Sequence, residues 1–276
     1  MRDGRRVGST SSNKTDTGTM NTRSGVAQRV DDLLVSEVEQ ILASVPYSAH
    51  LSSGDQELDE EYYVRHRIET IRRIRLTARV DALALARMIE EDYDSSRLWG
   101  RYTAEELNHD ILFRNDLRYH GCSDETIDGT APLQATRDLI AYLARRLDEI
   151  GSLAAVAYSL FVEWNSERVS ALVVARAERR FSARHLKGAR SHLHIDRHAG
   201  HYPMILAIAQ KLAVREEDER HLFTTLKDLA CLFGAYFREL HDVTVGKRTG
   251  GHSGPLEECA RRPDVGASPV TGDQLT

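Results

Sequence analysis

The chain has few cysteines, few prolines and no long apolar run, and each shortage excludes a class of protein. Its three cysteines (Cys122, Cys231 and Cys259) lie far apart without a Cys-x-x-Cys pair, which argues against a disulfide framework or a thiolate zinc site. Six prolines and 18 glycines among 276 residues exclude collagen-like and proline-rich chains. No run approaches about 18 uncharged apolar residues, so we expect no membrane-spanning helix and no membrane partner.

The sequence also lacks an excess of positive charge and a secretion signal. Its formal net charge is −5. Proteins that bind nucleic acid present a basic face to the phosphates, so we expect no nucleic-acid partner. The first 24 residues contain arginines but no apolar core of a signal peptide. Together with the sparse cysteines, this favours a cytoplasmic location.

Strand patterns are absent, and helical patterns take their place. No alternating run of β-branched residues stands between turn signals. Apolar residues instead recur at spacings of three and four, as in Val30, Leu33, Leu34 and Val38. Similar helical patterns cover residues 58–93, 103–120, 152–180, 184–213 and 215–243. About seven helices with short connections predict an all-α fold, a single helical bundle.

The two ends of the chain differ in composition from its middle. Residues 1–24 are rich in Ser, Thr, Gly and Arg and lack aromatic residues, which predicts a disordered N-terminal arm. Residues 246–276 are predicted to form a disordered C-terminal tail, which leaves 25–245 as the helical domain. Within it, Thr103 is expected to cap a helix that runs to about His120, with Glu106 completing a capping box.

Metal-ligating residue types occur on three separate helical segments. Glu106 and His109 are three residues apart, so we expect them on one helix face. Di-iron carboxylate bundles use Glu-x-x-His in this way. Glu163 follows Phe161 and Val162 in the most apolar segment of the chain. A carboxylate buried there needs a partner, and a metal ion is one such partner.

The third segment is a histidine cluster, SHLHIDRHAGHYP, at residues 191–203. His194, His198 and His201 have helical i, i+4, i+7 spacing and are expected to line one face. Pro203 is expected to bend the helix beside them. Each segment alone has a structural explanation: a helix cap, an ion pair to Arg168, and a solvated face. Their succession along the chain favours a metal site.

Glu-x-x-His, a lone Glu and the histidine cluster, in this order, resemble the haem-oxygenase-like non-haem di-iron oxidases over about residues 60–215. The strings WGRYTAEELNHD and LHID contribute to the resemblance. It implies a haem-oxygenase-like bundle with Glu106 and Glu163 as catalytic residues. It also implies metal ligation by Glu106, His109, Glu163, His194 and His201. In the family an acid follows the first histidine by four residues. Here His198 occupies that place and is a sixth candidate, and Asp196 is the only acid nearby.

The resemblance further implies two Fe(II) ions, O2 as co-substrate and an external electron donor. The substrate would be a small amine, amino acid or fatty acid, and the reaction N-oxygenation, desaturation or oxidative C–C cleavage. A homodimer is a further expectation.

Four other interpretations stay open at this point. Ferritin-like di-iron N-oxygenases and desaturases share Glu-Glu-x-x-His and add an upstream glutamate, for which Glu69 is the match unless it forms a surface ion pair. A helical binding protein would hold no metal. A haem protein would use one of the histidines. A thiamin-degrading enzyme would need a nucleophilic cysteine, for which Cys231 is the candidate unless it is a small core residue.

Overall fold

The computed structural model describes residues 17–54 and 57–249. Within these ranges the chain is helical and contains no strand, as predicted. Residues 1–16 of the predicted arm and 250–276 of the predicted tail lie outside the described residues. The first helix begins at Thr17, inside the segment predicted to be disordered. Within the same ranges, no helix is both long enough and apolar enough to cross a membrane.

Ten α-helices and three short 3-10 helices make up the described chain. The α-helices are α1 (Thr17–Ser44), α2 (Glu60–Glu91), α3 (Tyr93–Glu106), α4 (His109–Tyr119), α5 (Asp124–Gly129), α6 (Gln134–Ile150), α7 (Leu153–Glu178), α8 (Lys187–Ala199), α9 (His201–Leu212) and α10 (Glu216–Val243). The 3-10 helices are η1 (Ser48–Leu51), η2 (Ala183–Leu186) and η3 (Gly246–Thr249). The count exceeds the expected seven partly because two segments predicted as single helices are each broken in two.

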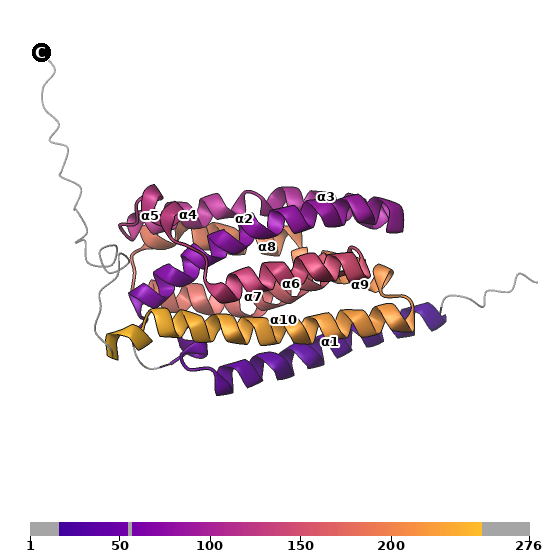
Figure 1. The fold of residues 1–276 in the computed structure, drawn as a ribbon, viewed down its shortest axis with the longest axis horizontal. Coiled ribbons are helices and arrows are strands. Elements are labelled where there is room, and N and C mark those ends of the chain that lie inside the picture. Colours follow the sequence, from indigo (N-terminus) through magenta and orange to yellow (C-terminus); the bar gives the residue numbers. More distant parts are fainter. Residues whose placement is uncertain (1–16, 55–56, 250–276) are drawn as a thin grey trace, which may run out of the picture.

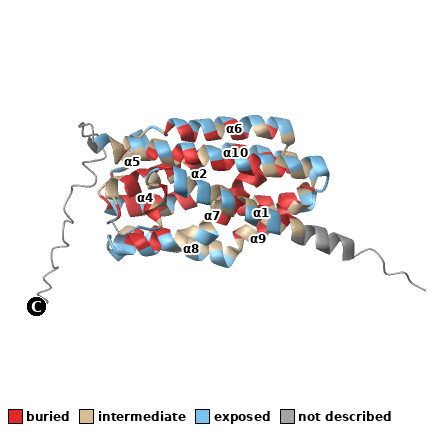
Figure 2. Cartoon of the chain, turned by 90° about the horizontal axis from the view of Figure 1, so that it is seen from below, coloured by how far each residue is buried: buried red, intermediate tan, exposed pale blue. Residues whose placement is uncertain are grey.

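Helix α7 forms the centre of the bundle. Residues 153–161 are all buried, and α7 packs against α2, α6, α8, α9 and α10. A segment that is apolar on every side is expected in such a position, because no face of residues 153–161 meets water, whereas Glu167, Arg168 and Leu172 further along α7 are exposed. Helices α1 and α10 run side by side along one edge of the molecule (Figure 1). Buried residues follow the inward faces of the surrounding helices, and exposed residues follow their outward faces (Figure 2).

The first broken segment is the one predicted to begin at Thr103. The N-cap of α3 is Asp92, eleven residues before the predicted cap, and α3 begins at Tyr93. The side chain of Asp92 accepts a hydrogen bond from the backbone N–H of Ser95. Thr103 therefore lies inside α3, and its predicted role as a cap is wrong. The chain leaves the helix after Glu106, and α4 begins at His109.

The second break falls within the histidine cluster. Helix α8 ends at Ala199, and Gly200 adopts the left-handed conformation (φ 65°, ψ 46°) before α9 starts at His201. Glycine takes this conformation without a steric penalty. Pro203 lies in the first turn of α9, where its missing N–H leaves no helical bond unmade. The break predicted near Pro203 is thus present but is made by Gly200, and the three histidines do not share one helix face.

Helices α4 and α8 lie close together at Gly188. The Asp116 carboxylate accepts hydrogen bonds from the backbone N–H groups of Gly188 (2.6 Å) and Ala189 (2.8 Å) at the start of α8. A Cβ atom at Gly188 would overlap the carbonyl oxygen of Leu112 on α4. Because Gly188 has no side chain, α8 can lie this close to α4.

Gly188→Ala is expected to lower the free energy of unfolding by about 1–3 kcal/mol, because two backbones must separate. Gly100→Ala is the matched control, since a Cβ there meets Leu85 at an ordinary 3.7 Å. The control is expected to keep or slightly raise stability, as alanine favours helix. Thermal denaturation of both variants measures the difference. An unchanged melting temperature in Gly188→Ala would contradict the tight contact.

Candidate metal centre

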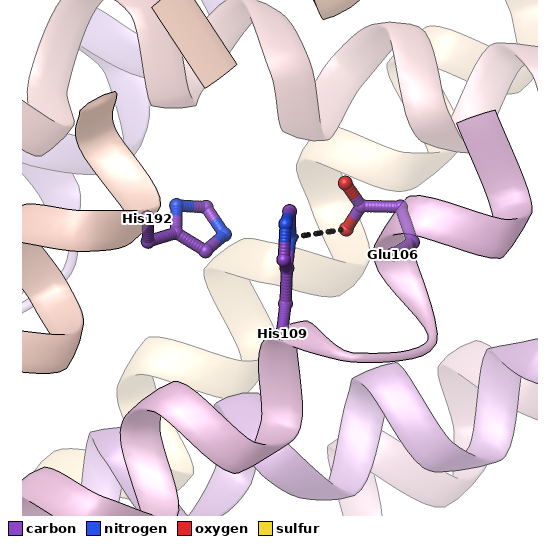
Figure 3. A group of neighbouring side chains, drawn as sticks. All are labelled: Glu106, His109 and His192. Carbon is purple, nitrogen blue, oxygen red and sulfur yellow. Dashed lines mark hydrogen bonds and ion pairs between the residues drawn. The ribbon is translucent and has the colours of Figure 1, made fainter. Parts of the chain in front are cut away.

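Glu106 and His109 meet at the turn between α3 and α4. His109 Nδ1 lies 3.1 Å from Glu106 Oε2 (Figure 3). His109 is buried and Glu106 is half-buried. The structure thus brings the predicted pair together, but through a tight turn between two helices and not through a shared helix face.

His192 on α8 joins this pair. Its ring points toward His109, and the two ring centroids are 4.4 Å apart (Figure 3). Glu106, His109 and His192 each offer one ligand atom, and these atoms lie within 4.8 Å of one another. His192 Nδ1 lies 3.0 Å from Asp196 Oδ2, which leaves Nε2 free for a metal ion. His192 was not among the predicted ligands.

A second group of ligand atoms consists of Glu106, Glu163 and His201, again within 4.8 Å of one another. His201 Nδ1 lies 3.3 Å from Glu106 Oε1 and 3.8 Å from Glu163 Oε1. These side chains come from α3, α7 and α9. Glu106 therefore belongs to both groups, with one carboxylate oxygen toward His109 and the other toward His201.

Asp196 lies beside the second group. Its Oδ1 is 3.6 Å from His201 Nδ1, and its Oδ2 accepts a hydrogen bond from Ser166 Oγ at 2.7 Å. Asp196 follows His192 by four residues. Counted from His192, the acid that the resemblance requires is present. The spacing His192-x3-Asp196 was the sequence signal for this pair.

His194 and His198 lie away from both groups. The two side chains are exposed, and their ring centroids lie 3.9 Å apart. His198 Nδ1 also lies 2.8 Å from the carbonyl oxygen of His194. Because the chain turns at Gly200, His201 enters the centre from a different helix, and α8 contributes His192 and Asp196 in place of the two predicted residues.

Three buried atoms of this cluster have no hydrogen-bond partner. They are Glu106 Oε1, Asp196 Oδ1 and His201 Nδ1. His201 Nε2 lies 2.8 Å from Glu105 Oε2, and an ionised carboxylate only accepts hydrogen bonds, so the ring proton belongs on Nε2. His201 Nδ1 then presents a lone pair to three carboxylate oxygens, from Glu106, Glu163 and Asp196. Buried polar atoms are normally satisfied, and a cation would satisfy all three at once, so these residues fit a metal ion.

Two further side chains hold the candidate ligands in place. Tyr102 donates a hydrogen bond from its hydroxyl to Glu163 Oε1 at 2.9 Å. Glu105 holds the far nitrogen of His201, as carboxylates commonly do for metal-bound histidines. Glu105 was not among the predicted site residues, although it is the first acid of the Glu-Glu-x-x-His string.

The electrostatics of the cluster favour a bound cation. Burial raises the pKa of Glu163 well above its usual value, and the negative charges of Glu106 and Asp196 raise it further. Burial opposes the charged form of His109, but the hydrogen bond to Glu106 and the negative charges of Glu106, Asp196 and Glu105 together outweigh this effect, so its pKa is raised. Three carboxylates in one buried space repel one another unless positive charge is added.

Asp81 on α2 extends the acidic cluster. Its burial, together with the charge of Glu106, raises its pKa to about 7. One of its carboxylate oxygens is buried and without a hydrogen-bond partner. Asp81 lines a cavity of about 260 Å³ with Tyr102 and Glu106.

A larger cavity of about 270 Å³ opens beside the cluster. Its walls are mostly apolar and include Phe161, Val162 and Phe233, and Glu106, Glu163 and His192 are among the polar residues that line it. Glu106 lines both cavities. The candidate centre therefore lies in a wall where a bound organic molecule would contact it.

Two residues from the alternative interpretations lie elsewhere. Glu69 is fully buried and pairs with Arg65 Nη2 at 2.8 Å, so the expected surface position is wrong. It belongs to neither ligand group. Cys231 is exposed on α10 and does not line either cavity, so neither a core position nor a catalytic position in the pocket holds for it.

Comparison with known proteins bears on the fold. No family model and no curated protein matches the chain. A solved structure from Shewanella denitrificans OS217, described as a domain of unknown function with a heme oxygenase-like fold, is similar with a TM-score of 0.69 and 19% sequence identity. The match covers 83% of this chain and 95% of that chain. The chain therefore has a haem-oxygenase-like fold, as the resemblance implied.

Proposed function

We propose that this protein is a non-haem di-iron oxidase or oxygenase that uses O2 to oxidise a small organic substrate. The observation that carries the proposal is the position of Glu106 in two ligand groups at once. A carboxylate whose two oxygens face different groups of ligands is suited to join two metal ions. A single-metal site does not require this arrangement.

One ion would be held by Glu106, His109 and His192. The other would be held by Glu106, Glu163 and His201, with Asp196 beside them. Mixed carboxylate and imidazole ligands suit iron, and no cysteine belongs to either group. When bound, such an iron pair would supply electrons for the reduction of O2.

The protein's own contribution is to orient the ligands and to surround the substrate. The hydroxyl of Tyr102 fixes Glu163, and Glu105 fixes His201. Ser166 and His192 together hold Asp196 Oδ2. Ligands whose orientation is set by such partners lose less freedom when a metal binds. The apolar cavity walls keep water away from a bound substrate. An external electron donor and a cytoplasmic location belong to the proposal.

The competing interpretations fit these observations less well. A haem would leave Glu106 and Glu163 as uncompensated acids in the wall of the cavity. A binding protein without metal would keep three buried polar atoms unsatisfied. A ferritin-like di-iron enzyme would share the chemistry, but the haem-oxygenase-like fold argues against that architecture.

The test is anaerobic loading with Fe(II), followed by metal analysis and measurement of O2 consumption. We expect about two iron ions per chain and O2 uptake when air is admitted. Glu163→Gln is expected to lose iron, whereas Glu167→Gln, which changes an exposed acid one turn further along α7, is expected to retain it. Absence of bound iron from the wild type, or a haem Soret band in the purified protein, would overturn the proposal.

A further inference from the structure

Two exposed histidines on α8 take no part in the candidate metal centre. His194 and His198 belong to neither ligand group, and their ring centroids lie 3.9 Å apart. Within residues 17–54 and 57–249, no other side chain forms a hydrogen bond or an ion pair with either ring. The pair is therefore open to a ligand from solvent.

The spacing of the two histidines suits one metal ion. Residues four apart on a helix have their Cβ atoms about 5–6 Å apart. Metal–nitrogen bonds of about 2.0–2.1 Å allow a single ion to join two imidazoles at this separation. Zinc-binding helices with a His-Glu-x-x-His motif use the same spacing. The short distance between the rings of His194 and His198 brings both imidazoles to one place on the surface of α8.

A hydrogen bond sets the tautomer of His198. Its Nδ1 lies 2.8 Å from the backbone carbonyl oxygen of His194. A carbonyl oxygen only accepts, so Nδ1 carries the proton, and Nε2 of the neutral ring has a free lone pair. Metal-bound histidines commonly donate their second ring N–H to a carbonyl or a carboxylate in this way. His198 is thus already oriented as a ligand through Nε2.

The surroundings of the pair select the kind of cation. Asp196 lies between the two histidines in the sequence, but its carboxylate oxygens face His201 and Ser166 in the interior. Arg197 is exposed and adds positive charge nearby. Mg²⁺ and Ca²⁺ need oxygen ligands, which the pair does not offer. Imidazole suits Ni²⁺, Cu²⁺ and Zn²⁺. Fe²⁺ stands lower in the order of affinity, so we expect the pair to release iron when free metal is removed.

We propose that His194 and His198 form a separate surface site for one divalent transition-metal ion of the Ni²⁺, Cu²⁺ and Zn²⁺ class, with water in the remaining positions. A bound ion joins the two ends of the helical turn 194–198. This turn carries Asp196 and lies at the end of α8, next to the left-handed Gly200. Because only the helical conformation presents both rings to one ion, binding stabilises the helix end against unfolding. The site does not depend on the proposed oxidase function.

The test is a titration of the full chain, without an affinity tag, with Ni²⁺. We expect His194→Ala and His198→Ala each to bind one Ni²⁺ ion about 100-fold more weakly than the wild type, since a second tethered ligand raises affinity by this order. The double variant is expected to lose the same single ion and no second one, because both residues hold one ion. His221→Ala removes a half-exposed histidine from α10 and is the matched control, expected to bind as many ions as the wild type.

Hydrogen exchange separates a stabilised helix end from adventitious binding. Saturating Ni²⁺ is expected to slow the amide exchange of residues 195–200 more in the wild type than in His198→Ala, and Mg²⁺ is expected to have no such effect. Unchanged Ni²⁺ binding in both single variants, or loss of two ions in the double variant, would overturn the inference. Equal slowing of exchange in the wild type and His198→Ala would show an adventitious ion only.

The outcomes also distinguish this inference from the proposed function. If the wild type binds Ni²⁺ at the surface pair but no iron in the interior, only the proposed oxidase function fails. If it binds iron in the interior but no Ni²⁺ ion is lost in His194→Ala and His198→Ala, only this inference fails.

Discussion

Glu106→Gln is expected to abolish iron binding, with a loss in affinity of more than about 100-fold, since even the partners of metal ligands contribute 10- to 100-fold. The substitution keeps the size of the side chain and removes its charge. Glu106 is present in both ligand groups, so the loss should affect both ions. Iron bound per chain, measured after anaerobic loading and removal of free metal, tests this directly.

A second variant tests whether the loss of iron is specific to Glu106. Glu105→Gln changes the neighbouring residue, which contacts the far nitrogen of His201 and belongs to neither ligand group. Its expected effect is a smaller loss, roughly 10-fold to 100-fold in affinity. Without metal, Glu106→Gln should be at least as stable as the wild type, because it removes one of several clustered acids. Full iron content in Glu106→Gln would show that the shared carboxylate is not a ligand.

His192→Ala is expected to reduce iron from about two ions per chain toward one. His192 belongs to the group of Glu106 and His109, and it does not belong to the group of Glu106, Glu163 and His201. The expected result is therefore a partial loss of metal, unlike the full loss in Glu106→Gln. The rate of O2 consumption should fall with it, because one metal ion alone does not complete the centre.

The matched controls for this prediction are His194→Ala and His198→Ala. Both side chains are exposed on the same helix as His192, and both lie outside the two ligand groups. We expect each variant to bind as much iron as the wild type. If His194→Ala lost iron while His192→Ala retained it, the helix-face interpretation of the sequence would be correct and the proposed ligand set would not.

Helical periodicity was sufficient to predict the fold class, because the 3.6-residue repeat of apolar residues is local and runs through most of the chain. Glu163 was also selected correctly as a buried acid, since residues 153–162, which precede it in α7, are mostly apolar. Its burial follows from composition alone. The pairing of Glu106 with His109 was predicted for the wrong reason, because the turn between α3 and α4 brings them together.

The choice among the histidines required tertiary structure. Periodicity treats residues 184–213 as continuous, and any continuous helix places His194, His198 and His201 on one face. A single left-handed residue, Gly200, rotates everything that follows. The glycine was visible in the sequence, but a glycine within a helical pattern either continues the helix at some cost or ends it, and the local pattern does not decide between these outcomes.

The sequence by itself determined the all-helical bundle and the residue types at its centre, because burial and helical period depend on near neighbours along the chain. Only the tertiary structure decided which side chains meet. The shared position of Glu106 and the entry of His192 and Asp196 depend on contacts between helices that lie far apart in the sequence. Such contacts follow from how the helices pack and where they end. A local sequence pattern predicts neither of these.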